Sequence, residues 1–198
     1  MPGCFQPQSG HINGGADTRS KVTSVTVEFD NEVDHTALLS AFTITNITTN
    51  TPVGTVNVAP TDSGGKTTAV LTFSGDSTVA PINGSLATTL VDGNYRLDIT
   101  AGQVRLATNN AATMPVDYVF GGQSKADPNN DKFFRHYGDE DGDGDTDFAD
   151  FAGGFLPAFG STLGNNGYRE DLDFDGDADV DFADFANGFL PSFGSVRP

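Results

Sequence analysis

Apolar and polar residues alternate along much of the first 120 residues of the chain. The segment 24–29 reads Ser-Val-Thr-Val-Glu-Phe, in which every second residue is apolar. A period of two is the pattern of a strand with one buried face. The same pattern recurs, and about seven strands are expected, at 25–29, 42–44, 56–58, 69–73, 95–99, 104–106 and 116–118. Short strands separated by turns rich in Gly and Asn predict an antiparallel sandwich rather than a βαβ sheet.

Polar stretches without periodicity lie on both sides of this β-rich segment. Residues 1–20, rich in Gly, Gln, Ser and Pro, offer little to bury and are expected to form a disordered leader. Residues 122–131 are polar and rich in helix and strand breakers, which predicts a linker. The predicted organisation is therefore a leader, a β domain at 21–121, the linker, and a carboxyl-terminal domain at 132–198. One helical turn is expected at 34–40.

The hydrophobic pattern changes to helical spacing near the carboxyl end. Phenylalanines recur there at intervals of three and four residues, which predicts two amphipathic helices. They are Phe148, Phe151, Phe155 and Phe159, followed by Phe182, Phe185, Phe189 and Phe193. Because Pro157 and Pro191 lack an amide hydrogen, each helix is expected to kink or end near Leu156 or Leu190. We expect the two stripes to pack against each other, with some of the eight phenylalanines left for a partner.

Two twelve-residue segments carry aspartate at regular positions. Residues 139–150 read Asp-Glu-Asp-Gly-Asp-Gly-Asp-Thr-Asp-Phe-Ala-Asp, and residues 173–184 read Asp-Phe-Asp-Gly-Asp-Ala-Asp-Val-Asp-Phe-Ala-Asp. Between 139–161 and 173–195, 18 of 23 positions are identical, so this region is an internal duplication with a shift of 34 residues. Carboxylates at positions 1, 3, 5, 9 and 12 match the spacing that surrounds one Ca²⁺ with oxygen ligands. A solvated acidic tail has no reason to repeat this spacing.

We therefore predict two Ca²⁺ sites, one in each loop. The first three aspartates donate side-chain oxygens, the seventh residue its backbone carbonyl, the ninth a water-bridged contact, and the twelfth completes the shell. The predicted ligands are Asp139, Asp141, Asp143, Asp145, Asp147 and Asp150 in the first loop, and Asp173, Asp175, Asp177, Asp179, Asp181 and Asp184 in the second. The twelfth residue is Asp where an EF-hand has Glu, which weakens the preference for calcium over magnesium. Gly144 suits the sharp turn at the sixth position, whereas Ala178 replaces it in the second loop, so the second site is expected to be weaker.

Each loop is followed by a predicted helix but not preceded by one. The segments 133–137 and 163–168 are too short for an incoming helix, so each motif is a loop followed by a helix, an F-hand. Asp147 and Asp181 are placed to cap the following helices, each with an acid three residues later, as in a capping box.

Charge and composition exclude several functions. The net charge is −17, and residues 132–198 hold 15 acidic and 4 basic side chains, so nucleic acid and anionic lipid are not expected as partners. Cys4 is the only cysteine, which excludes an internal disulfide, and the three histidines are too scattered for a zinc site. No apolar run approaches the ~20 residues of a membrane span, and no signal peptide is visible, so membrane insertion is not expected.

Over residues 132–198, the duplicated Asp-x-Asp-x-Asp loops, each followed by a helix, resemble type I dockerin domains. The resemblance implies a calcium-folded module that docks onto a cohesin-like protein partner and can offer it the same surface in two orientations. It also implies that recognition uses the tenth and eleventh loop positions, which are Phe148 with Ala149 and Phe182 with Ala183. Phe-Ala departs from the small hydroxyl residues common there.

Residues 20–121 are similar to the immunoglobulin-like modules that precede dockerin-like ends in large secreted planctomycete-type bacterial proteins, judging from the segments 24–29 and 69–75. The expected fold class is therefore an all-β immunoglobulin-like antiparallel sandwich followed by a small all-α dockerin-like pair of calcium loop–helix motifs. The implied location is extracellular or at the cell surface, as part of an exported chain.

The expected function is non-catalytic: a calcium-dependent protein interaction or attachment module with an immunoglobulin-like spacer. Two alternatives are a calcium buffer or sensor and a calcium-stabilised structural tail of a larger secreted protein, with glycan binding by the β domain left open. An enzyme is not expected, because every well-spaced carboxylate is assigned to metal and the β domain has few acids and no motif for a nucleophile.

Overall fold

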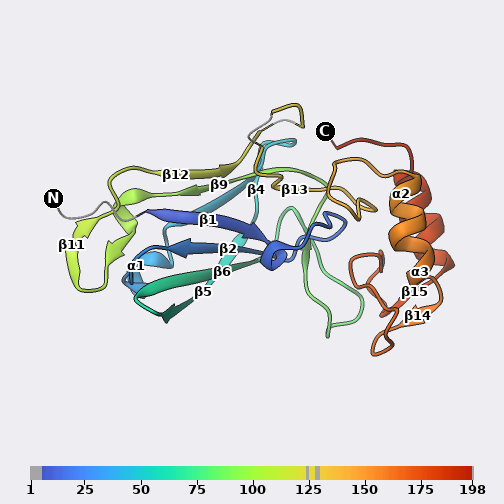
Figure 1. Ribbon diagram of the computed structural model, residues 1–198, viewed down its shortest axis with the longest axis horizontal. Helices are drawn as coiled ribbons and strands as arrows, with labels where there is room; N and C mark the ends of the chain where they lie inside the picture. Colours follow the sequence, from blue (N-terminus) through green and yellow to red (C-terminus); the bar gives the residue numbers. More distant parts are fainter. Residues whose placement is uncertain (1–5, 124, 128–129, 198) are drawn as a thin grey trace.

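The computed structural model describes residues 6–123, 125–127 and 130–197. β-strands fill one end of the molecule and two short helices lie at the other (Figure 1). The strands are β1 (Pro7–Ile12), β2 (Ser24–Phe29), β3 (Phe42–Asn46), β4 (Thr51–Pro52), β5 (Thr55–Ser63), β6 (Lys66–Ser74), β7 (Thr78–Val79), β8 (Thr89–Leu90), β9 (Gly93–Ile99), β10 (Arg105–Leu106), β11 (Asn109–Thr113), β12 (Tyr118–Gly121), β13 (Phe134–Arg135), β14 (Ser161–Thr162) and β15 (Asp179–Val180).

The α-helical segments are α1 (His35–Leu38), α2 (Phe148–Asp150), α3 (Leu156–Ala158), α4 (Phe182–Asp184) and α5 (Leu190–Ser192). A π-helical turn, Phe151–Phe155, joins α2 to α3, and Phe185–Phe189 joins α4 to α5. The result is two continuous helices, 148–158 and 182–192, called here the first and second helix. Short 3₁₀ turns lie at Asn13–Gly15 and Ala101–Gln103.

Two larger sheets enclose the main hydrophobic core. One has the strand order β1-β2-β6-β5, and the other has the order β12-β9-β3-β4 with β13 beside β9. Alternate residues of neighbouring strands point into the core: Val25 in β2 pairs with Leu71 in β6, and Ile44 in β3 pairs with Leu97 in β9. These side chains are at most 1% exposed. The apolar face of each strand is therefore buried between the sheets, as the period of two predicts.

All seven strands expected from alternation coincide with or overlap strands of the structure. β5 and β6 are joined by Gly64 and Gly65, whose φ angles of 60° and 81° are those of a two-residue hairpin turn that favours glycine. The expected helical turn is α1, in which the amide of Thr36, the second residue, donates to the side chain of the cap Asp34 at 2.9 Å. Local pattern and turn chemistry thus determine these elements.

Residues 6–20 have a defined structure, contrary to the disorder predicted for this part of residues 1–20. β1 pairs antiparallel with β2 and forms an edge of its sheet. An edge strand needs little apolar surface: Ile12 is 3% exposed, and Pro7 stands at the strand start, where no donor is required. The low hydrophobicity of this segment therefore does not indicate disorder. Residues 1–5, including Cys4, lie outside the described residues.

The expected fold class is wrong. The chain is mostly β, with several small sheets, and in the described residues only the first and second helix extend beyond one short turn. The carboxyl-terminal part is not all-α, because it includes β13 and the β14-β15 pair and consists largely of loops. The β-rich part is not an immunoglobulin-like sandwich. Alternation shows which face of a strand is buried, but it does not show which strand is its neighbour.

The two copies of the duplication interlock around a pseudo-two-fold axis. The amide of Gly160, after the first helix, donates to the carbonyl of Val180 in the second loop at 2.7 Å. Its counterpart after the second helix, Gly194, donates to Thr146 in the first loop, also at 2.7 Å. Each loop is therefore held by the segment that leaves the other helix, and neither copy is complete alone.

The helices end later than the prolines predict. Pro157 lies inside α3 and the helix ends at Ala158, while the second helix ends at Ser192. The π-helical turn before each proline shifts the hydrogen-bond pattern, since Leu156 N donates to Phe151 O, five residues earlier. This wider turn accommodates the missing proline donor without a break.

Candidate metal centre

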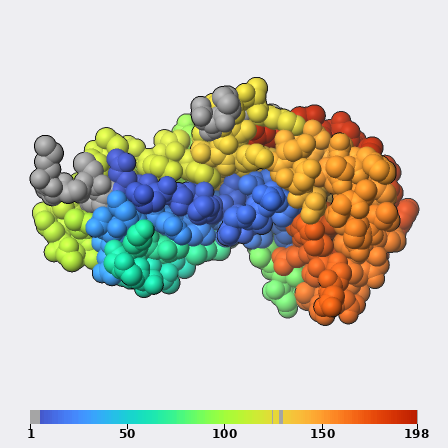
Figure 2. Space-filling view, in the orientation of Figure 1, coloured from blue at the N-terminus to red at the C-terminus, as the bar shows by residue number. Residues whose placement is uncertain are grey.

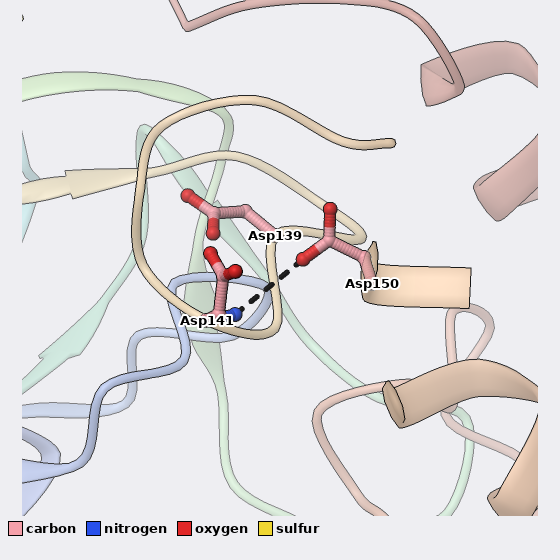
Figure 3. Close-up of side chains that lie close together, drawn as sticks. All are labelled: Asp139, Asp141 and Asp150. Atoms are coloured by element: carbon pink, nitrogen blue, oxygen red, sulfur yellow. Dashed lines mark hydrogen bonds between the residues drawn. The ribbon is translucent and has the colours of Figure 1, made fainter. Parts of the chain in front are cut away.

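Each predicted calcium loop gathers its aspartate carboxylates into two triads that share the twelfth residue. In the first loop, Asp139, Asp141 and Asp150 offer oxygens within 4.8 Å of one another, and all three turn toward a common space (Figure 3). Asp145 and Asp147 form a second triad with Asp150, at the same limit of 4.8 Å. The second loop repeats both triads with the equivalent residues: Asp173, Asp175 and Asp184, and Asp179, Asp181 and Asp184.

The first aspartate of each loop organises the turn. The Asp139 carboxylate accepts from the amides of Gly142 at 2.6 Å and Gly144 at 2.9 Å. Asp173 accepts in the same way from Gly176 at 2.7 Å and Ala178 at 3.0 Å. Because the backbone wraps around its carboxylate, Asp139 is fully buried and its charge is shielded from water.

The twelfth aspartate closes the loop and starts the helix. Asp150 accepts from the amides of Glu140 and Asp147, both at 2.8 Å. The Asp147 side chain in turn accepts from Ala149 N at 2.6 Å, which completes a capping box. Asp184 accepts at 2.7 Å from Phe174 and Asp181, and a second capping box starts the second helix. The predicted capping is confirmed in both copies.

The fifth and seventh positions differ from the predicted assignment. Asp143 and Asp177 belong to neither triad, and each accepts instead from the amide two residues later, at 3.0 Å and 3.2 Å. Asp145 and Asp179 were expected to contribute only backbone carbonyls, yet their side chains belong to the second triads. The structure thus brings ten of the twelve predicted residues together through their carboxylates.

Burial and like charge raise the pKa of several of these groups. Desolvation is the largest cause for Asp139, whose pKa rises to about 7, and for Asp184, whose pKa rises to about 6. Burial also raises the pKa of Asp150, Asp141 and Asp175, and the neighbouring aspartate charges add to the shift. These carboxylates are costly to ionise without a nearby cation.

The donor set fits a hard divalent cation. Each cluster offers carboxylate oxygens only, without sulfur or imidazole, which suits Ca²⁺ or Mg²⁺ and disfavours zinc or copper. One oxygen of Asp179 is buried and has no hydrogen-bond partner. A cation in the loop would coordinate this unpaired oxygen and would also neutralise the clustered negative charge.

The two loops share these predicted ligands but differ in the residue at the sixth position and in the neighbouring side chains. Ala178 has φ of 85°, as its equivalence to Gly144 at 93° predicts, so a residue with a side chain occupies the left-handed region. Lys125 pairs with Asp145 of the first loop at 2.9 Å. In the second loop, the Tyr168 hydroxyl donates to Asp173 at 2.7 Å.

The helices pack against each other through the inner phenylalanines. The ring centroids of Phe155 and Phe189 are 4.8 Å apart, and those of Phe151 and Phe185 are 6.1 Å apart. Phe155 and Phe189 are 1% exposed and belong to a second hydrophobic cluster with Tyr137, Leu172 and others. The expected contact between the stripes is confirmed for these residues.

The outer side chains of both helices are left exposed. Phe148 and Phe182 are each 68% exposed, Leu156 and Leu190 each 56%, Phe159 48% and Phe193 46%. Two apolar grooves of about 230 and 240 Å³ lie on this surface, which we call the helix face. One is lined by Phe148, Phe151, Phe185, Phe189, Leu190 and Phe193, and the other by the six residues that a shift of 34 makes equivalent. The predicted recognition residues Phe148 and Phe182 line one groove each.

Sequence reasoning missed the contacts that hold the loops from outside. Gly142, with φ of 73°, lies so close to Asp17 that an added Cβ would meet its carbonyl oxygen at 2.1 Å. Gly176, its equivalent, would meet Pro81 at 2.6 Å. The available signal was glycine at the fourth position of both loops, which marks a close backbone approach. Nothing in the sequence named the approaching segments.

Comparisons with known proteins identify no family. No protein-family model matches the chain, and no curated protein matches it either. Among solved structures, a crystal structure of the S-layer protein SbsC has 20% identity and a TM-score of 0.36 over 59% of this chain. A structure of SbsC domains 1–6 has 21% identity and a TM-score of 0.38 over 64%. The chain spans 13 to 14% of those chains, and at these TM-scores nothing about its function follows.

In the described part of the chain, no helix has both the length and the apolar character that crossing a membrane requires.

Proposed function

We propose that the chain is a non-catalytic, calcium-dependent interaction module. Two Ca²⁺ ions bind in the loops 139–150 and 173–184, and the helix face docks a protein partner. One observation carries this proposal: the shift of 34 residues that relates the two acidic clusters also relates the two apolar grooves. A duplication that served metal binding alone would not need to leave the same apolar side chains exposed twice.

Calcium would act through the stability of the loops and helices. Asp150 and Asp184 are buried, and each is at once a predicted ligand and a member of a helix capping box. A cation that neutralises these carboxylates stabilises the start of each helix, so binding free energy appears as folding free energy. The helix face is therefore presented only by the metal-bound, ordered helices.

The surroundings of the helix face indicate the chemistry of the partner. Phe148 and Phe182 are exposed beside the exposed caps Asp147 and Asp181. Residues 132–198 hold 15 acidic and 4 basic side chains (−11, or −7 with two Ca²⁺ bound), so an apolar patch on this region fits a protein surface with an apolar centre and a rim of Lys or Arg. The resemblance of the loop–helix repeat to type I dockerins supports a cohesin-like partner. The same resemblance supports a place at the cell surface, with the β-rich part as a spacer.

The test is capture of a protein partner from the envelope fraction of the source cells. Immobilised wild-type chain should retain the same partner in calcium and release it in EDTA. The double variant Phe148→Ser/Phe182→Ser should lose the partner. The control Leu39→Ser also replaces an exposed apolar side chain (56% exposed) by serine, but in the β-rich part, and should keep the partner. Capture that is unaffected by EDTA, or by the double variant, would contradict the proposal. A panel of purified cohesin domains tests the family of the partner in the same format.

A calcium sensor is the main competing function, and it predicts an apolar surface that is covered until calcium binds. In the folded helices Phe148 and Phe182 are exposed, and the described segments before the two loops contain no helix that could cover them, which favours a docking surface that needs ordered helices but no opening step. A hydrophobic dye distinguishes the two, because a sensor should gain dye fluorescence when calcium is added, and a docking module should not.

A further inference from the structure

The two calcium loops lack incoming helices, and another part of the chain occupies that place. Residues 18–21, which connect β1 to β2, lie against the segments that lead into both loops. Figure 2 shows the blue amino-terminal part of the chain against the orange carboxyl-terminal part. Arg19, Ser20 and Lys21 are each at most 8% exposed, although all three are polar or charged. Their burial depends on the hydrogen bonds that they make there.

Residues 18–21 hold the start of the first loop through its backbone. The carbonyl of Asp139, the first predicted ligand, accepts from the amides of Arg19 at 2.8 Å and Ser20 at 2.9 Å. The amide of His136 donates to the carbonyl of Arg19 at 3.0 Å. These bonds replace those that an incoming helix would supply to the same backbone.

The hydroxyl of Ser20 joins the two loops. It donates to the carbonyl of Asp171 at 2.5 Å and accepts from the amide of Gly138 at 3.0 Å. Gly138 directly precedes the first ligand of the first loop, and Asp171 lies two residues before Asp173, the first ligand of the second. Ser20 is fully buried, so no water replaces either bond if the hydroxyl is removed.

Neighbouring contacts strengthen the same connection. The Thr18 hydroxyl donates to the Asp171 carboxylate at 2.9 Å, and Lys21 pairs with Glu170 at 2.9 Å. The second loop has a further contact with the β-rich part, since Asn83 N donates to Gly176 O at 2.6 Å. Both loops are therefore fixed by residues far away in the sequence.

We infer that Ser20 is a positioning residue for both calcium sites, and that residues 18–21 couple the two sites to each other. The inference rests on the proposed calcium binding. Because one hydroxyl orients the backbone before both first ligands, its loss should weaken both sites together rather than one of them. The coupling would also tie calcium occupancy to the order of the connection between β1 and β2.

The experiment compares Ser20→Ala with Thr67→Val in the full chain. Thr67 is a matched control: it is fully buried, its hydroxyl donates to Asp62 and accepts from the amide of Val33, and it belongs to β6, away from the loops. Calorimetric calcium titration, well below the unfolding temperature, should show about tenfold weaker binding at both sites in Ser20→Ala. Thr67→Val should lower stability but keep both affinities within about twofold of the wild type.

A milder variant covers the case in which Ser20→Ala fails to fold. Thr18→Val removes the bond of a half-buried hydroxyl to Asp171 at 2.9 Å, together with two longer contacts at 3.3 Å, to Asp139 O and from Ser20 N, and both affinities should fall about threefold. Unchanged affinities, or weakening of one site alone, would overturn the inference. Hydrogen exchange in EDTA gives a reading that needs no calcium: the Gly138 amide should be protected in the wild type and exchange faster in Ser20→Ala. A wild type that binds no calcium but shows this difference would refute the proposed function and leave the connection intact.

Discussion

The first loop and the second loop have the same plan but different surroundings. Both wrap a buried first aspartate and both start a helix with a capping box. The first has Gly144 in the left-handed region and a lysine beside Asp145. The second has Ala178 there and a tyrosine hydroxyl on Asp173. Ligand spacing is thus duplicated faithfully, while backbone strain and neighbouring charge are not. Affinity should differ between loops that share a ligand set.

Removing metal should have the largest effect, because it acts on both loops. At a calcium concentration 100 times the dissociation constant, each occupied site adds about 2.7 kcal/mol to the free energy of unfolding. EDTA should therefore lower it by about 5 kcal/mol, or roughly 10 °C or more in the thermal midpoint. Scanning calorimetry with and without calcium measures this. A midpoint that does not move would show that the loops contribute no metal-dependent stability.

Substituting the twelfth residue should separate the loops. Asp150→Asn and Asp184→Asn each remove one carboxylate charge and keep one oxygen for the capping amide of Asp147 or Asp181, but lose the acceptor for the amide of Glu140 or Phe174, so each variant should bind one calcium. The affinity that survives should be higher in Asp184→Asn, which keeps the first loop. Asp76→Asn, an exposed change in the β-rich part, is the control and should bind two. A higher remaining affinity in Asp150→Asn than in Asp184→Asn would contradict the expectation that the second loop binds more weakly.

The pH dependence should change sign when calcium is added. Without metal, burial raises the pKa of Asp139 from 3.8 to about 7. The folded chain then holds a proton that the unfolded chain has lost, so this group's contribution to stability falls as pH rises from about 4 to 7. Calcium requires the ionised form, and its stabilisation should grow over the same range.

The measurement is the thermal midpoint between pH 5 and 8, in EDTA and in calcium. Asp139→Asn cannot titrate at this position, so in EDTA it should be less sensitive to pH than the wild type. Equal slopes for the two proteins in EDTA would exclude Asp139 as the source.

Substitutions at the sixth loop position should have the smallest effect on the free energy of unfolding. Ala178→Gly relieves a left-handed alanine, and the free energy of unfolding should rise by about 1 kcal/mol. Gly144→Ala introduces a left-handed alanine into the first loop, with its methyl 3.2 Å from the Arg197 side chain, and should lower the free energy of unfolding by at least about 1 kcal/mol. Urea denaturation in excess calcium compares the two. A destabilising Ala178→Gly would mean that the alanine methyl packs well enough to outweigh its backbone strain.

The sequence predicts local features well and long-range ones poorly. Period-two alternation identified the seven strands, and Asp147 and Asp181 identified the helix starts. These depend on neighbouring residues. The fold class failed because strand order and the proportion of loop depend on distant contacts. Ser20 was missed for the same reason, since a serine in a polar stretch gives no sign that the segments before the two aspartate loops bury it.

Direct calcium titration of the metal-free chain tests the central claim. The account predicts two calcium ions bound per chain, the second loop being the weaker, and no binding by the double variant Asp150→Asn/Asp184→Asn. Absence of binding in the wild type at millimolar calcium, or two ions bound by the double variant, would contradict it.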